Sequence, residues 1–131
     1  MASDYSTYLG NKVVRWLAGQ SFPSAPASIW CALFNGDPKS GGSDVTTTIR
    51  AGGRVQIAVT APASGTTNTM DNDSDVDFGD ADGAATVTHM AVYDASSSGN
   101  LLGSKSVGSN SISAGELVKF LAGDITFSMG S

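Results

Sequence analysis

The hydrophobic pattern of the chain changes at a proline-containing linker, residues 23–26. After the linker, short apolar runs are separated by turn-forming residues, as in β-proteins. From Ser28 onward, short runs rich in Val, Ile, Thr and aromatic residues alternate with clusters of Gly, Asn, Asp and Ser. Such alternation is typical of successive strands with tight connections. A parallel sheet would need helices between its strands. The pattern therefore predicts a mainly β fold, a single antiparallel β-sandwich of jelly-roll type with about eight strands.

The predicted strands follow from the apolar runs and from the turns between them. We expect strands at residues 28–34, 45–50, 53–60, 75–79, 85–93, 100–107, 116–121 and 124–129. The last two runs are joined by Ala122-Gly123-Asp124, which predicts a hairpin in which Gly123 supplies a positive φ. The polar segments at 35–44, 61–69 and 94–99 are expected to be surface loops.

One amphipathic helix is expected before the linker, at residues 4–18. Apolar side chains recur there at steps of three and four, which places them on one stripe; they are Tyr5, Leu9, Val13 and Trp16 with Leu17. Ser3 is the expected cap, and Arg15 and Gly19 suit the end of the helix. The stripe must pack on the protein's own sheet or on a neighbouring subunit. The predicted organisation is a helix in residues 1–20 and a β-sandwich domain in residues 21–131.

The charge of the chain is concentrated in one segment. The 131 residues carry 7 Lys and Arg against 12 Asp and Glu, a formal net charge of −5. Half of the acids are aspartates in the segment 71–82: Asp71, Asp73, Asp75, Asp77, Asp80 and Asp82. The few cations are scattered, so nucleic acid is not an expected partner.

The aspartate spacing at 71–75 is the part of the sequence most similar to a metal-binding motif. Asp71, Asp73 and Asp75 stand at the first, third and fifth positions of a calcium loop, but Val76 replaces the glycine at the sixth. We therefore expect no helix-loop-helix calcium site, and a looser loop site at these three aspartates stays an open alternative. The competing interpretation is an edge strand with Val76 and Phe78 inward and the aspartates in water.

Groups that could carry catalysis are few. Cys31 lies in an apolar run and is expected to be buried, and His89 lies in a strand pattern as a hydrogen-bonded wall residue. The sequence has no nucleophile-elbow, phosphate-loop or metalloprotease motif. It also has no secretory signal or apolar run long enough to span a bilayer. We expect no enzymatic activity, no cofactor and no membrane partner.

The order of motifs resembles a family of small virion proteins of tailed bacteriophages, variously labelled tail fibre or head decoration proteins. The resemblance covers nearly the whole chain, and the Asp-rich stretch at 71–82 departs from it. It rests on the runs Ser28-Ile29-Trp30-Cys31-Ala32-Leu33-Phe34-Asn35-Gly36-Asp37-Pro38, Gly52-Gly53-Arg54-Val55-Gln56-Ile57, Val87-Thr88-His89-Met90-Ala91-Val92-Tyr93 and Ile112-Ser113-Ala114-Gly115-Glu116-Leu117.

The resemblance implies a non-enzymatic structural protein of a phage particle, assembled in the host cytoplasm and kept in the virion. We expect a capsid cement or decoration protein that binds the outside of the shell and stabilises it through many copies. The alternative is a tail-fibre tip, receptor-binding module or adaptor. The expected partners are the major capsid protein or other virion proteins, together with copies of the chain itself as a dimer or trimer. Tyr5, Tyr8 and Trp16 are the candidate interface residues.

Overall fold

The computed structural model describes residues 4–62, 65, 67 and 69–128, and in this part of the chain the fold is mainly β. The strands are β1 (Ile29–Asn35), β2 (Ser43–Asp44), β3 (Val55–Ile57), β4 (Thr69–Asp71), β5 (Val76–Asp80), β6 (Ala85–Tyr93), β7 (Leu101–Ile112), β8 (Leu117–Phe120) and β9 (Thr126–Ser128). The helices are α1 (Thr7–Leu17), the single turn α2 (Thr46–Ile49) and the 3-10 turn η1 (Pro38–Ser40).

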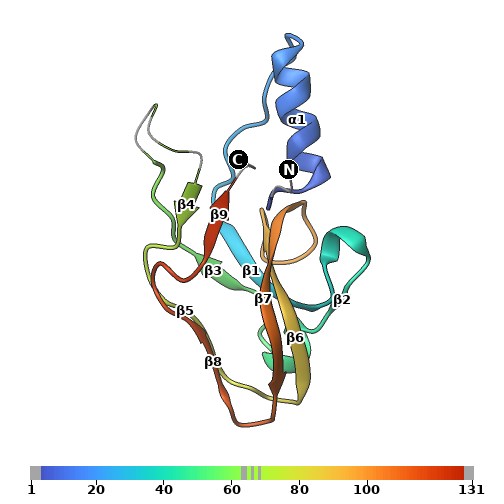
Figure 1. The fold of residues 1–131 in the computed structure, drawn as a ribbon, viewed down its shortest axis with the longest axis vertical. Coiled ribbons are helices and arrows are strands. Elements are labelled where there is room, and N and C mark those ends of the chain that lie inside the picture. Colours follow the sequence, from blue (N-terminus) through green and yellow to red (C-terminus); the bar gives the residue numbers. More distant parts are fainter. Residues whose placement is uncertain (1–3, 63–64, 66, 68, 129–131) are drawn as a thin grey trace.

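All strand pairs among the described residues are antiparallel, and they form two layers. The larger sheet has the order β2-β1-β6-β7, with β3 on the same edge of β1 as β2. The pairs β4-β9 and β5-β8 form the second layer (Figure 1). The predicted antiparallel, mainly β fold with a helix near the N-terminus is confirmed. The jelly-roll connectivity stays a prediction.

The core lies between these layers. Leu33, Met90 and Val92 from the larger sheet are buried against Phe78 and Phe127 from the second layer. Ala32, Phe34 and Ala91 lie on the other face of the larger sheet in a separate cluster. Burial of apolar area in these clusters is the main force that holds the layers together.

The helix starts later than the sequence predicts. Ser6, not Ser3, is the cap of α1, and its Oγ accepts a hydrogen bond from the backbone N–H of Leu9 at 3.1 Å; Ser3 lies outside the described residues. Asp4 and Tyr5 are extended because their backbones bond to neighbouring strands instead. The end of the helix is as expected, since Gly19 has a φ of +93°.

Residues 45–50 form a helical turn, so the strand predicted there is wrong. Asp44 Oδ1 accepts from the backbone N–H of Thr46, and Thr46 Oγ1 bonds to both N and O of Leu33. These bonds take the place of a strand ladder and bury Thr46 and Ile49 in the core. A run of threonines has strand propensity, and tertiary hydrogen bonding overrides it here.

The hairpin predicted at the C-terminus is also wrong. β8 pairs with β5, and β9 pairs with β4, so the two strands lie end to end rather than side by side (Figure 1). Gly123 does have the expected positive φ, +82°. The connection is held by Asn72, because its backbone O accepts from Gly123 N and its side chain bonds to Leu121 O and Ile125 N.

Other strands begin or end at residues different from those predicted. Of the strand expected at 53–60, only β3 pairs with β1. Beyond β3, Ala58 O accepts a hydrogen bond from Asp73 N, and Val59 forms a bridge with Asn72. β7 runs on to Ile112, and the short strands β2 and β4 were not expected. The inward placement of Val76 and Phe78, with Asp75 and Asp77 exposed, is confirmed.

Candidate functional site

The segment Asp4–Ser6 anchors α1 to the β-sandwich. Ser6 N donates to Leu102 O at 2.8 Å, and Ser104 N donates to Asp4 O at 2.8 Å, so the segment pairs with β7. The carboxylate of Asp4 accepts from Ser128 N of β9 at 2.9 Å and lies 3.5 Å from Lys105 Nζ. The start of the helix is therefore fixed to both layers of the sandwich.

The rest of α1 stands beyond the sheets. Figure 1 shows it at one end of the long axis, with the chain from Ala18 to Ser28 returning beside it. All residues of α1 are described, and none of them is buried. Isolated helices of this length have marginal stability in water. A partner that covered the exposed half of α1 would therefore stabilise the helix.

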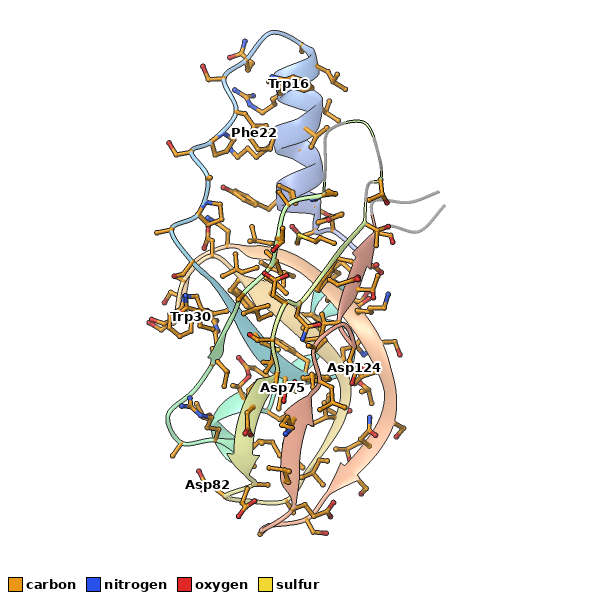
Figure 2. The ribbon with its side chains drawn as sticks, turned by 90° about the vertical axis from the view of Figure 1, so that its left-hand side faces the viewer. Trp16, Phe22, Trp30, Asp75, Asp82 and Asp124 are labelled. Atoms are coloured by element: carbon orange, nitrogen blue, oxygen red, sulfur yellow. The ribbon has the colours of Figure 1, made fainter. Side chains whose placement is uncertain are left out.

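Four large apolar side chains lie exposed on this projection. The exposed fractions are 64% for Val14, 57% for Trp16, 72% for Leu17 and 46% for Phe22. Figure 2 shows Trp16 near the far end of the projection and Phe22 lower down, on the chain that returns beside the helix. We call these four residues the N-terminal knob. Large exposed apolar side chains on one projection mark it as a candidate interaction surface.

The predicted interface residues are placed differently from one another. Tyr5 is half-buried, its ring 6.3 Å from that of Phe127, and burial together with the charge of Asp4 raises its pKa. Tyr8 is half-buried, with Lys12 Nζ 5.3 Å from its ring centre. Trp16 alone belongs to the knob. The apolar stripe of the helix is thus divided, its lower part packed on the protein's own sheet and its upper part exposed.

Sequence reasoning missed Val14 and Phe22. Val14 is three residues from Leu17 but lies away from the centre of the stripe formed by Tyr5, Leu9, Val13 and Trp16, and Phe22 lies beyond the end of the helix. One signal in the sequence could have found them. A helix packed on one sheet needs one apolar stripe, and apolar residues outside that stripe indicate additional exposed apolar surface.

An apolar cleft of about 270 Å³ lies at the base of α1. Tyr5, Leu9, Ile29, Met70 and Leu102 contribute to its lining. Binding sites for polar substrates combine apolar walls with a few placed polar groups, and the side chains named here supply only the Tyr5 hydroxyl. We therefore assign no binding role to the cleft and describe it as the apolar junction between α1 and the sheets.

The three aspartates considered for a metal loop are held apart by other bonds. Asp73 Oδ2 accepts from Thr60 Oγ1 at 2.8 Å, while Asp75 lies 3.4 Å from Lys119 Nζ and accepts from Ala122 N. Asp71 is exposed in β4. Among the described residues, no group of three acidic, His or Cys side chains is arranged to hold a metal ion.

Cys31 and His89 do not form a catalytic pair. Cys31 is fully buried in the core between the layers, and this burial raises the pKa of its thiol well above the ordinary value. His89 pairs in register with Phe34, whose side chain lies on the outer face of the same sheet. The predicted hydrogen bond of His89 is present, to Thr88 Oγ1 at 2.9 Å.

The outer face of the larger sheet carries an aromatic pair, one member of which is covered by an arginine side chain. Trp30 and Tyr93 are register partners. The guanidinium of Arg54 lies 3.7 Å from the ring centre of Tyr93 and donates to the carbonyls of Ala95 and Ser98, both at 2.8 Å. One face of Tyr93 is therefore covered by Arg54, and this contact fixes the 94–100 loop.

Comparison with known protein families places the chain in a phage family. The family model described as podophage GP4 fiber I protein gp80 matches residues 4–128. No curated protein matches the chain. Among the described residues, no helix has the length and apolar character needed to cross a membrane.

Proposed function

The chain belongs to the podophage GP4 fiber I protein gp80 family, and from this premise we propose that it is an attachment module of a phage fibre. The family match indicates a structural protein of the virion. The proposal adds a mechanism, in which the β-sandwich is a rigid body and the N-terminal knob joins it to a neighbouring subunit of the particle.

The knob is the observation that carries the proposal. Three of its side chains, Val14, Trp16 and Leu17, are more than half exposed on a helix whose preceding segment, Asp4–Ser6, is bonded to both layers. A rigidly mounted projection loses little conformational entropy on docking, which favours binding. Aromatic anchors such as Trp16 are the residues that contribute most to protein interfaces.

The test replaces the knob in the full chain. Removal of the whole helix would also remove the bonds of Asp4 and Ser6 to β7, so point substitutions are cleaner. A phage lacking the gene would be complemented with the wild-type chain, with the double variant Trp16→Ser/Leu17→Ser, or with the control Gln20→Ala on the same projection.

We expect the double variant to be lost from purified particles while the control is retained. Incorporation of the double variant at the wild-type level would overturn the proposal. The same quantitative gel gives the copy number. A handful of copies per particle supports the fibre location, whereas hundreds of copies would favour the capsid cement role that the sequence led us to expect.

A further inference from the structure

A second concave site lies on the β-sandwich, between β7 and β8. It is a groove of about 260 Å³ whose apolar walls include Val107, Ile112, Leu117 and Phe120, and Asn110 and Lys119 also line it. Leu117 is 60% exposed at its edge. We call it the β7–β8 groove. It lies toward the end of the molecule opposite α1 (Figure 1).

Three acidic side chains lie near this groove, on β5 and just before β8, while Lys119 is part of its lining. Glu116 precedes Leu117 in the chain, and Asp80 is the register partner of Leu117 across the β5-β8 pair. Asp77 is the register partner of Lys119, and all three acids are exposed. Lys119 Nζ lies 3.4 Å from Asp75, so an acid outside this group already offsets its charge.

The N-terminal knob has the opposite charge. Residues 5–36 contain two charged side chains, Lys12 and Arg15, and both are basic. Arg15 is adjacent in sequence to Trp16, so a cation accompanies the largest apolar group of the knob. The groove thus offers apolar walls with three exposed acids nearby, and the knob offers an apolar group with a positive flank. Such complementarity favours and orients association.

The two surfaces cannot meet within one molecule. Figure 2 shows Trp16 and Phe22 at one end of the long axis and Asp82 at the other. The helix start is held to β7 and β9 by backbone hydrogen bonds, so α1 is not free to swing down the body.

We propose that the knob of one copy docks in the β7–β8 groove of a second copy. Trp16 enters the groove beside Leu117, and Arg15 faces Asp80 and Glu116. Because the two surfaces differ, the contact is head to tail, and it closes into a ring or continues as a filament of identical chains. This inference rests on the proposed function, since it names the neighbouring subunit that the knob binds.

The test uses two full-length variants that each remove one side of the contact. The knob variant is Trp16→Ser/Leu17→Ser, and the groove variant is Leu117→Ser/Asp80→Lys. All four side chains are exposed, so both variants are expected to fold, which circular dichroism and thermal melting would verify. The mass of each protein would be measured by light scattering over a range of concentrations, with Gln20→Ala as the control.

We expect the wild-type chain and the control to associate, and each variant alone to associate at least about tenfold more weakly. An equal mixture of the two variants should form a one-to-one complex, because one variant retains the groove and the other retains the knob. A mixture that stays monomeric would overturn the head-to-tail contact, and so would a wild-type chain that is monomeric throughout.

Failure of this inference is distinguishable from failure of the proposed function. A monomeric wild-type chain, combined with loss of the knob variant from particles, would overturn the self-contact and leave the attachment role standing. Normal incorporation of the knob variant would overturn the attachment role itself.

Discussion

The side chain of Asn72 accepts a hydrogen bond from the backbone N–H of Ile125 at 2.9 Å, across 53 residues of sequence. Asn72 is 3% exposed, and its Nδ2 also donates to Ser74 O and Leu121 O. One buried amide therefore joins the acidic segment to the connection between β8 and β9. This explains why those two strands separate instead of forming a hairpin.

We predict that Asn72→Ala destabilises the protein by about 3 kcal/mol, because the buried N–H of Ile125 and two part-buried carbonyls lose their partner. Denaturant unfolding would measure the change. The exposed Asn35→Ala is the matched control and should change the free energy of unfolding by less than about 0.5 kcal/mol. Equal stabilities for the two variants would contradict the role given to Asn72.

A second prediction concerns Gly103, where the anchor of α1 crosses β7. A Cβ there would lie 2.7 Å from Asp4 O and 3.2 Å from Phe127 Cε1. We expect Gly103→Ala to cost about 1–3 kcal/mol by overpacking and to loosen the anchor. Trypsin should then cleave after Arg15 faster than in the wild type.

Gly10→Ala is the control for this experiment, since a Cβ at Gly10 meets nothing within 4 Å and alanine favours a helix. It should not accelerate cleavage. Unchanged cleavage of Gly103→Ala would show that the backbone contact of Asp4 does not hold the helix in place.

A third prediction concerns acid stability. Partial desolvation acts to raise the pKa of Asp37, but hydrogen bonds from Lys39 N and Ser104 Oγ, with the charges of Lys39 and His89, lower it below the ordinary value. The folded state therefore binds this proton less readily than the unfolded state. The resulting stabilisation is present above about pH 4 and is lost as the pH falls through the pKa of folded Asp37.

We expect melting temperatures measured between pH 7 and pH 3 to show a smaller acid-induced loss in Asp37→Asn than in the wild type. Ser104→Ala removes one of the two donors and should lie between them. Parallel pH profiles for Asp37→Asn and the wild type would rule out this contribution.

A fourth prediction concerns the Cys31 thiol. Cys31 is fully buried, and the pKa of its thiol is raised, so little reactive thiolate forms and reagents have no access. We expect a thiol reagent at pH 8 to modify Cys31 only after unfolding. An exposed thiol introduced by Ser109→Cys, in a strand position open to solvent, should react at once. Equal rates at the two positions would show that the core opens readily.

The sequence by itself determined the class of the fold and the presence of a helix before the strands. Alternation such as Val76-Asp77-Phe78 predicts which side chains face the core, because successive side chains in a strand point to opposite faces. The linker after the helix and the positive φ of Gly123 are likewise local properties. The burial of Cys31 followed from its apolar neighbours.

Only the tertiary structure decided which strands pair and where the exposed apolar surface lies. The helical turn at Thr46, the separation of β8 from β9 and the late start of α1 each depend on hydrogen bonds between residues far apart in sequence. The knob and the β7–β8 groove have the same origin. An apolar stripe shows that a helix must be covered, but a period of 3.6 residues carries no information on whether the cover is the same chain or another.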